Sequence, residues 1–315
     1  MRIVVTFLPS EKLQKELQEE FKNCEFTFVK NIENGHESIL KEAEVIVTYG
    51  EDITDEMVEN MPSVKWFMVA SAGLEKMPLK WIEEKTILLT NAKGIHKKPM
   101  AEFAIGTILR HAKRFQELDR QQQAQTWNRR LPFKELTDDT LLIVGTGAIG
   151  QEIAKFAKAF DIQTVGINTS GKRVPYFDET FSMGMLGEIL SKADYVINLL
   201  PSTPSTRYVY DLEHFNKMKS SAVFINLGRG DAVSQDVLVE GARKIAHLYL
   251  DVFEIEPLPK VSPLWTSPNV TITPHISSIS SYYQIRAMEI FKENLQAYLN
   301  GKEHFLNQVP PSRGY

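Results

Sequence analysis

Short apolar runs alternate with polar stretches of helical period along the first ninety residues of the chain. The first polar stretch is SEKLQKELQEEF, and the apolar runs are, in order, RIVVTFL, EFTFV, EVIVTY, SVKWFMVA and TILLT. Strands that alternate with helices in this way form βα units around a parallel sheet. The pattern therefore predicts an α/β fold for this part of the chain.

A different pattern begins near residue 91. From residue 98 to about residue 125, apolar side chains recur at helical spacing, which predicts one long amphipathic helix between two domains. A second series of alternating units follows, with the apolar runs DTLLIVG, QTVGIN, DYVINLL, AVFINLG, HLYLDVF and NVTITP. Nearly all positions in these runs are apolar, which is typical of strands buried on both faces of a parallel sheet.

The chain closes with one helical segment and a short tail. The segment SISSYYQIRAMEIFKENLQAYLNG predicts a long helix that ends at Gly301, a residue suited to the left-handed position after a helix. The tail HFLNQVPPSRGY holds two prolines and a glycine, which predicts a chain that is irregular or loosely ordered. The tryptophans are expected to fill the cores: Trp66, Trp81, Trp127 and Trp265.

Composition limits the partners and the location of the protein. The chain has 315 residues, enough for two medium domains, and a net charge of −4 with no dense block of Lys or Arg. This balance argues against binding to a nucleic-acid backbone or to an anionic membrane surface. The single cysteine, Cys24, excludes an intrachain disulfide and a cysteine-rich zinc site. Because no apolar run is long enough for a signal peptide or a membrane span, the sequence predicts a soluble, cytoplasmic protein.

The sharpest local motif is a glycine-rich turn in LLIVGTGAIGQEIAKFAKAF. Gly145, Gly147 and Gly150 form the pattern GxGxxG between an apolar run and a helical pattern, and Ala148 and Ile149 lie inside it. The first glycine allows a tight bend, the second lets a pyrophosphate approach the backbone, and the third lets the helix pack on the strand. The motif predicts a dinucleotide site made by these residues. The alternatives are a purely structural turn and the glycine-rich loop of a methyltransferase.

The residues after the next apolar run bear on the choice of cofactor. NAD sites place an acidic residue about 20 positions after the motif to bind the ribose 2′-hydroxyl, but this chain has Asn168 there. An amide does not repel a 2′-phosphate. The following positions add hydroxyls and cations, namely Thr169, Ser170, Lys172 and Arg173. We therefore expect these residues to bind NADP(H) in preference to NAD(H); the alternative is that the two cations are solvated loop charges.

Ionisable side chains follow three later apolar runs, at the edge where open α/β sheets bind their ligands. They are Arg229 in FINLGRGD, Asp251 and Glu256 in LDVFEIEP, and His275 in TITPHIS. Reduction of a ketone needs a cation that polarises the substrate and an acid that supplies a proton, tasks suited to Arg229 and His275. A carboxylate such as Glu256 beside the imidazole would favour its protonated form. Taken singly, Arg229 could be a surface ion pair, Glu256 a solvated loop acid and His275 a hydrogen-bonding residue at a strand end. The other histidines show no metal-ligand spacing, so no metal is predicted.

Six blocks in order resemble the D-isomer-specific 2-hydroxyacid dehydrogenases over nearly the whole chain: LLIVGTGAIGQEIA, YVINLLPSTPSTRYVYD, AVFINLGRGDAV, LDVFEIEPLP, SPLW and NVTITPHIS. The resemblance implies that Arg229, Glu256 and His275 are the catalytic residues. It implies that Asp251 helps to hold the nicotinamide, and that further residues line the cofactor cleft, namely Ile149, Leu200, Pro201, Thr206, Leu227 and Gly228. In the segment VASAGLEKM, the backbone of Ser71, Ala72 and Gly73 would hold the substrate carboxylate.

Within that family, SVKWFMVASAGLEK, MAEFAIGTILRHAKRF and QQQAQTW look most like the glyoxylate/hydroxypyruvate reductase A subgroup, which typically uses NADPH. The resemblance implies an α/β fold of two domains, with a Rossmann-type doubly wound nucleotide-binding domain inserted into a flavodoxin-like substrate domain. The expected boundaries are residues 98–282 for the nucleotide-binding domain and residues 1–97 plus 283–315 for the substrate domain. The resemblance also suggests a homodimer formed through the nucleotide-binding domains and the long helix that begins near Lys98.

The combined prediction is a reductase that prefers NADPH, with NAD as a possible second cofactor, and converts a small 2-keto acid such as glyoxylate or hydroxypyruvate to the D-2-hydroxy acid. Two alternatives stay open. One is a dinucleotide-sensing binding protein of the corepressor kind, because one fold can serve several functions. The other is a phosphoglycerate dehydrogenase, which stays open because the sequence motifs do not identify which residues would bind a substrate phosphate.

Overall fold

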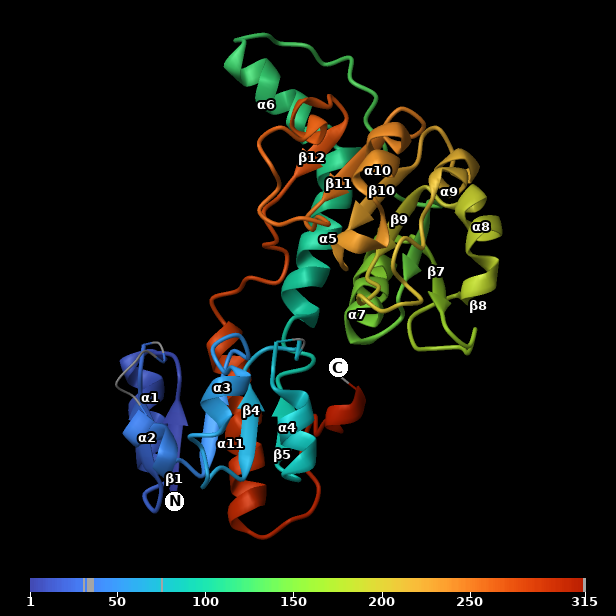
Figure 1. Ribbon diagram of the computed structural model, residues 1–315. Helices are drawn as coiled ribbons and strands as arrows, with labels where there is room; N and C mark the ends of the chain where they lie inside the picture. Colours follow the sequence, from blue (N-terminus) through green and yellow to red (C-terminus); the bar gives the residue numbers. More distant parts are fainter. Residues whose placement is uncertain (31, 33–36, 75, 314–315) are drawn as a thin grey trace. The chain divides into compact units, whose positions relative to one another are not determined.

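The chain folds into two compact units, each built on its own parallel sheet (Figure 1). The computed structural model describes residues 1–30, 32, 37–74 and 76–313. Unit 1 contains Met1–Ile95 and Ser280–Tyr315, and unit 2 contains His96–Ile279. The two ends of the chain therefore build unit 1 together. In the described part of the chain, no helix is long and apolar enough to cross a membrane.

Unit 1 is built on a five-stranded sheet in the order β2-β1-β3-β4-β5, in which all neighbours are parallel. Its strands are β1 (Arg2–Val5), β2 (Glu25–Phe28), β3 (Val45–Thr48), β4 (Trp66–Val69) and β5 (Leu88–Asn91). Its helices are α1 (Glu11–Glu20), α2 (Glu37–Glu42), α3 (Asp55–Val58), α4 (Leu79–Glu84) and α11 (Tyr283–Leu299). This strand order is that of flavodoxin-like folds, so the predicted fold class is confirmed for this unit.

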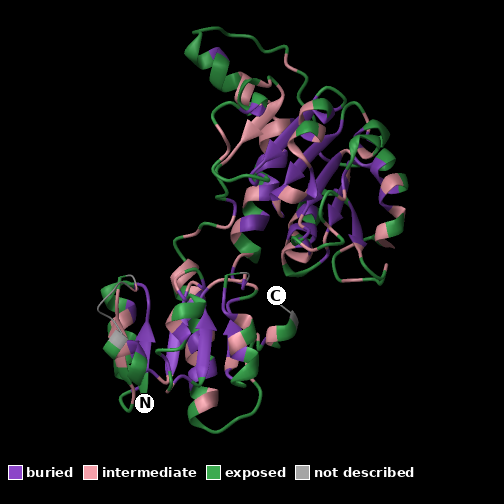
Figure 2. Ribbon diagram, viewed as in Figure 1, coloured by how far each residue is buried: buried purple, intermediate pink, exposed green. Residues whose placement is uncertain are grey.

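Helix α11 belongs to the core of unit 1 although it comes last in the chain. Its residues Phe291 and Leu295 are fully buried against the sheet, and Figure 2 shows the buried strands between more exposed helices. The ring of Trp66 on β4 stacks at 5.4 Å on Phe291 and at 5.4 Å on Tyr298. The helix ends before Gly301, whose φ is +66°, in agreement with the predicted stop.

Unit 2 contains a seven-stranded parallel sheet in the order β12-β11-β10-β9-β6-β7-β8. Its strands are β6 (Thr140–Val144), β7 (Gln163–Asn168), β8 (Glu179–Ser182), β9 (Tyr195–Asn198), β10 (Val223–Asn226), β11 (His247–Leu250) and β12 (Val270–Ile272). Its helices are α5 (Lys97–Ala112), α6 (Phe115–Gln123), α7 (Ala148–Ala157), α8 (Leu186–Ile189), α9 (Leu212–Lys217) and α10 (Gln235–Gly241). The order reverses between β6 and β9, as in a doubly wound Rossmann fold, and ligands bind such sheets at that reversal. The Rossmann prediction is therefore confirmed.

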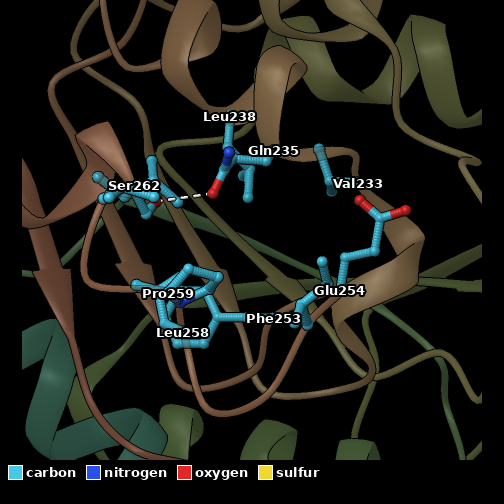
Figure 3. A pocket seen from close by; sticks show the side chains of 11 residues that line it. Val233, Gln235, Leu238, Phe253, Glu254, Leu258, Pro259 and Ser262 are labelled. Carbon is cyan, nitrogen blue, oxygen red and sulfur yellow. Dashed lines mark hydrogen bonds between the residues drawn. The ribbon is translucent and has the colours of Figure 1, made fainter.

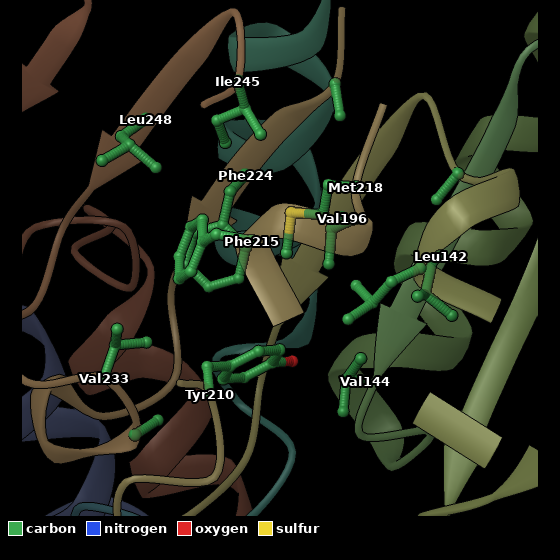
Figure 4. Packing of buried hydrophobic residues seen from close by; sticks show 14 of the residues in the cluster. Leu142, Val144, Val196, Tyr210, Phe215, Met218, Phe224, Val233, Ile245 and Leu248 are labelled. Carbon is green, nitrogen blue, oxygen red and sulfur yellow. The ribbon is translucent and has the colours of Figure 1, made fainter. Parts of the chain in front are cut away.

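Apolar side chains cover both faces of the unit 2 sheet. Along β6, Leu142 and Val144 pack into one core together with Phe224, and this core is drawn in Figure 4. The alternate residues Leu141 and Ile143 pack into a second core on the opposite face, against α5 and α7. Burial on both faces explains why this strand reads as one continuous apolar run.

The single long helix predicted from residue 98 to about residue 125 is wrong, because two helices occupy this stretch. Helix α5 ends at Ala112, and α6 begins at Phe115 after Arg114, whose φ of 55° lies in the left-handed region. The carbonyl group of Ala112 accepts a hydrogen bond from the N–H of Lys134 instead of continuing the helix. Phe115 is 47% exposed, so the apolar positions of α6 do not extend the buried face of α5.

Two further predictions are corrected. Trp66 is buried, but Trp127 is 91% exposed and Trp265 is 51% exposed, so not every tryptophan fills a core. The described part of the tail is not loosely ordered, because it is hydrogen bonded to β5. The N–H of Val309 donates to the carbonyl of Leu89, and Gln308 forms an antiparallel bridge with Thr90.

Candidate active site and cofactor site

The glycine-rich turn joins β6 to α7 at the point where the strand order reverses. Gly145 has a φ of +108°, and an added Cβ would lie 3.2 Å from the backbone of Leu199. Gly150 lies inside α7, where a Cβ would approach the carbonyl oxygen of Gly145 to 2.3 Å. These two glycines are therefore required by the fold of the turn itself.

Gly147 differs from the other two glycines of the motif. An added Cβ at this position would meet no atom within 4 Å, so packing does not explain the glycine. Gly147 immediately precedes α7, and Ala148 opens the helix. The backbone N–H groups at a helix N-terminus attract anions, and a bare glycine beside them leaves room for a pyrophosphate. The turn thus fits the phosphates of a dinucleotide, whereas Ile149 is partly buried against the core.

The loops after β9 and β10, at the same edge of the sheet, are in direct contact with each other. Gly228 packs so tightly that an added Cβ would lie 2.7 Å from the carbonyl oxygen of Leu200. The side chains of Leu200 and Leu227 are buried in the two cores, and the N–H of Leu227 donates to Asn198 at 3.1 Å. The hydroxyl of Thr206 donates to the carbonyl of Pro201 at 2.5 Å. The structure therefore gathers the residues predicted to line the cofactor cleft along one edge of unit 2.

Asn168 organises the loop after β7 rather than extending freely. Its Oδ1 accepts hydrogen bonds from the N–H groups of Ser170 at 3.1 Å and Gly171 at 2.7 Å. Its Nδ2 donates to the hydroxyl of Thr146 at 3.2 Å and to the carbonyl of Lys172 at 3.0 Å. The amide thereby connects this loop to the glycine-rich turn.

The cations of this loop are available to an anion. Thr169, Lys172 and Arg173 are exposed, and no acidic side chain of the described residues forms an ion pair with either cation. Gly171 has a φ of +70°, which bends the loop just before the two cations. Unpaired cations beside an uncharged Asn168 are suited to a phosphate group.

His275 and Glu256 form a hydrogen-bonded pair beyond the ends of β12 and β11. The Nδ1 atom of His275 lies 2.8 Å from Oε2 of Glu256, and because a carboxylate only accepts, the imidazole is the donor. The other carboxylate oxygen, Oε1, accepts from the N–H of Phe253 at 2.9 Å. The carboxylate therefore fixes the ring of His275, which leaves Nε2 as the nitrogen that can exchange a proton with a substrate.

Asp251 shapes the backbone that carries His275. It is 1% exposed, and its two carboxylate oxygens accept from the hydroxyl of Thr273 at 2.5 Å and from the N–H groups of Ile276 and Ser277 at 2.9 Å each. The N–H of His275 donates to the carbonyl of Asp251 at 2.8 Å. His275 adopts a φ of 53°, a conformation that side chains disfavour and that these bonds hold in place. In this structure Asp251 acts as the anchor of the His275 loop.

Arg229 lies between two tightly packed glycines. An added Cβ on Gly230 would meet the backbone of Phe253 at 1.9 Å, so the Arg229 loop packs directly on the segment that leads to Glu256. His96, which no sequence motif marks, lies close enough to Arg229 to be affected by its charge. Burial lowers the pKa of His96, and the charge of Arg229 lowers it further, although a hydrogen bond to the backbone of Ser278 opposes the shift. No local motif in the sequence indicates that His96 lies near Arg229.

Ser71, Ala72 and Gly73 lie in unit 1, after β4. The carbonyl of Ser71 accepts from the N–H of Ala92 at 2.9 Å, and the carbonyl of Ala72 accepts from the side chain of Asn91 at 2.9 Å. Among the described residues, no acceptor is found for the backbone N–H groups of Ser71, Ala72 and Gly73. A row of backbone donors without acceptors is suited to a carboxylate.

Comparison with known proteins places these features in a family. Residues 105–277 match the family described as D-isomer specific 2-hydroxyacid dehydrogenase, NAD binding domain. The chain belongs to the D-isomer specific 2-hydroxyacid dehydrogenase family. It is therefore an NAD(P)-dependent oxidoreductase, and unit 2 contains the NAD-binding domain of the family, as the sequence predicts.

Several relatives cover the chain at similar identity. Glyoxylate/hydroxypyruvate reductase B of Klebsiella pneumoniae is 30% identical, over 95% of this chain and 95% of that protein. D-3-phosphoglycerate dehydrogenase of Methanocaldococcus jannaschii is 31% identical over 84% of this chain but only 51% of that protein. The crystal structure of a D-isomer specific 2-hydroxyacid dehydrogenase family protein from Aeromonas salmonicida superposes with a TM-score of 0.88 at 28% identity, and covers 98% of both chains. The Klebsiella reductase is named as a B enzyme, whereas the sequence blocks look most like the A subgroup. Both subgroups belong to the same family.

Proposed function

We propose that this dehydrogenase reduces a small 2-keto acid to the D-2-hydroxy acid and prefers NADPH as the cofactor. The observation that carries the proposal is the pair of His275 and Glu256, joined at 2.8 Å beside the loop of Arg229. Such an arrangement provides both a proton donor and a cation for a carbonyl that becomes an alkoxide. A reductase of glyoxylate and hydroxypyruvate among the relatives supports the substrate class.

Each of the three side chains has one role in this proposal. Arg229 binds the substrate and polarises its carbonyl group. The bound reduced nicotinamide supplies the hydride. His275 donates the proton from Nε2 to the carbonyl oxygen, because Nδ1 is engaged by Glu256. Glu256 holds the ring in the orientation needed for this transfer.

The preference for NADPH rests on the loop after β7. Asn168 is uncharged, and its amide is occupied by hydrogen bonds that set the loop conformation. Lys172 and Arg173 would then bind the 2′-phosphate, with the hydroxyls of Thr169 and Ser170 as further partners. The glycine-rich turn would hold the pyrophosphate at Gly147.

Ser71, Ala72 and Gly73 would bind the substrate carboxylate through their backbone N–H groups. Glyoxylate and hydroxypyruvate are the first substrates to test. The relative named D-3-phosphoglycerate dehydrogenase makes 3-phosphohydroxypyruvate the second candidate substrate. The two candidates differ by a phosphate, so their relative kcat/KM distinguishes them directly.

We also propose that the protein is a homodimer of the reducing cytoplasm. The arm formed by α6 and the residues after it exposes Phe115, Leu118, Trp127 and Phe133. Apolar side chains gathered on an exposed segment are typical of an interface. Light scattering of the purified protein should give twice the mass of one chain, and Trp127→Ala should shift the measured mass toward that of the monomer.

The proposed location rests on a separate observation. The only cysteine, Cys24, is free, as suits a reducing compartment.

The experiment that tests the proposal is a steady-state comparison of NADPH and NADH oxidation with glyoxylate, hydroxypyruvate, pyruvate, longer 2-keto acids and 3-phosphohydroxypyruvate. We expect turnover of a small 2-keto acid, with a higher kcat/KM for NADPH than for NADH. Chiral analysis should show the D isomer as the product. Tight NADPH binding without turnover of any 2-keto acid would instead favour the dinucleotide-sensing alternative.

A further inference from the structure

Tyr208 joins the cofactor side of unit 2 to the segment that carries Glu256. It lies in the loop of residues 201–210, which follows β9 and contains Thr206. Its hydroxyl donates to Oε1 of Glu254, two positions before Glu256, and its N–H donates to the carbonyl of Asp231 at 2.7 Å. One residue therefore contacts the loops of both Arg229 and Glu256.

The backbone of Tyr208 is held in a conformation that a large side chain disfavours. Its φ is 52°, in the left-handed region where bulky residues are uncommon. The surrounding contacts maintain this conformation, because the N–H is bound by Asp231, the hydroxyl is bound by Glu254, and the Arg207 guanidinium lies 5.2 Å from the ring centroid. Conformations of this kind persist where the neighbouring structure fixes them, and they concentrate at functional sites.

The segment that Tyr208 contacts, residues 253–256, also contacts the other loops of the proposed active site. The N–H of Phe253 donates to Glu256, which in turn binds the ring of His275. The backbone of Phe253 and Glu254 also supports the Arg229 loop through the close contact with Gly230. A displacement of this segment would therefore move the proton donor and the substrate-binding cation together.

A cavity borders that segment on the side away from Gly230. Behind it lies a largely apolar cavity of about 200 Å³, lined by Val233, Leu238, Phe253 and Leu258 among others (Figure 3). Figure 3 shows Glu254 at one end of this cavity and Ser262 at the other, where its hydroxyl donates to Gln235 at 2.7 Å. The polar contacts of Glu254 and Ser262 therefore help to hold the loop where it borders this cavity.

We propose that Tyr208 is a positioning residue, and that its hydrogen bond to Glu254 couples the cofactor-side loop 201–210 to the segment that aligns Glu256, His275 and Arg229. The inference rests on the proposed reductase function. Tyr208 acts through its neighbours and touches no reacting atom. Small displacements of catalytic groups reduce rates steeply, so the pair affects kcat more than cofactor affinity.

The first test compares Tyr208→Phe, Glu254→Ala, Glu254→Gln and the double variant Tyr208→Phe/Glu254→Ala. We expect Tyr208→Phe to lower kcat about three- to tenfold, as for loss of one ordinary, solvent-exposed hydrogen bond, with KM for NADPH within about twofold of wild type. Glu254→Gln keeps an acceptor oxygen and should retain most of the activity. The double variant should be no slower than the single variants, because both remove the same bond. The matched control is Tyr176→Phe, since Tyr176 is also exposed and left-handed, with a φ of 70°.

A second readout does not depend on turnover. In wild type, NADPH should slow amide hydrogen exchange in residues 253–256, and Tyr208→Phe should abolish this slowing while NADPH still binds. If wild type turns over no 2-keto acid, the proposed function fails, and the exchange experiment still decides the coupling. Wild-type kcat in Tyr208→Phe, additive losses in the double variant, or NADPH protection that survives Tyr208→Phe would each overturn the inference.

Discussion

Two glycines of the same turn should respond differently to substitution by alanine. Gly150→Ala places a methyl group 2.3 Å from the carbonyl oxygen of Gly145, whereas Gly147→Ala places one where no atom lies within 4 Å. The first substitution therefore challenges the fold of the turn, and the second fills only the space available to a ligand. The comparison separates a structural glycine from a cofactor-binding one.

The expected magnitudes follow from these distances. The contact at Gly150 is about 1 Å shorter than ordinary van der Waals contact and involves backbone, so overpacking should cost about 1–3 kcal/mol. A gain in helix propensity of up to about 1 kcal/mol offsets part of this cost. Gly147 is the N-cap of α7, where alanine is less favourable than glycine by under about 1 kcal/mol. Gly147→Ala should nevertheless raise the Kd for NADPH at least about tenfold, because the methyl group blocks approach to the helix N-terminus.

Thermal unfolding and NADPH titration by fluorescence measure the two effects on the same samples. For a domain of the size of unit 2, a loss of 1 kcal/mol lowers Tm by roughly 2–4 °C. We expect Gly150→Ala to lose stability as well as NADPH binding, and Gly147→Ala to lose mainly NADPH binding. Wild-type affinity for NADPH in Gly147→Ala would refute the assignment of the phosphate site, and wild-type stability in Gly150→Ala would refute the packing argument.

Other parts of unit 2 carry three more predictions. Asp251→Asn replaces one acceptor oxygen by a donor, so urea denaturation should show a loss of about 2–3 kcal/mol and kcat should fall with it; a stable and fully active variant would contradict the anchor role. Arg173→Ala should reduce the ratio of kcat/KM for NADPH over NADH about tenfold, whereas an unchanged ratio would mean that the cation is a solvated loop charge. Burial lowers the pKa of His111 and of His247 from 6.5 to about 4. The unfolded chain therefore takes up protons first as the pH falls, and stability should decline from about pH 6.5 toward pH 4, by about 2 kcal/mol per histidine at pH 5. Tm measured from pH 7 to pH 5 should fall less in the variant His111→Gln/His247→Gln, and an equal decline would show that other groups control it.

The sequence predicted most of the fold because apolar runs mark nearly every strand of both sheets. The exception is β8, Glu179–Ser182, an edge strand with no fully buried residue. It pairs with β7 through backbone hydrogen bonds, and such bonds leave no apolar pattern to detect. The break between α5 and α6 was missed for a related reason. Helical spacing continues through Arg114, and only the left-handed backbone at that residue ends the helix.

Side-chain identity did not reveal burial. The sequence predicts that Trp66 and Trp127 both fill a core. Trp66 stacks on α11, but Trp127 is 91% exposed in the segment after α6. An aromatic residue at an interface has the same composition signal as one in a core. The distinction needs the packing of elements distant in sequence.

The sequence predicted those residues of the candidate site that directly follow strands at a common edge of the sheet. The motif analysis selected His275 and Glu256, and the structure joins them at 2.8 Å across 19 positions of sequence. The anchoring bonds of Asp251 and the contact of Tyr208 with Glu254 were not predicted, because bonds between distant loops depend on the path of each loop and carry no local motif. The same holds for the left-handed backbone of His275.

The central claim is that His275 supplies the proton when a small 2-keto acid is reduced. The most direct measurement is the kcat of His275→Ala for NADPH oxidation with glyoxylate and hydroxypyruvate, together with the Kd for NADPH. The account predicts a loss of at least about 100-fold in kcat, as for removal of a general acid, with the Kd for NADPH within about twofold of wild type. A variant that keeps wild-type kcat while binding NADPH normally would contradict the account.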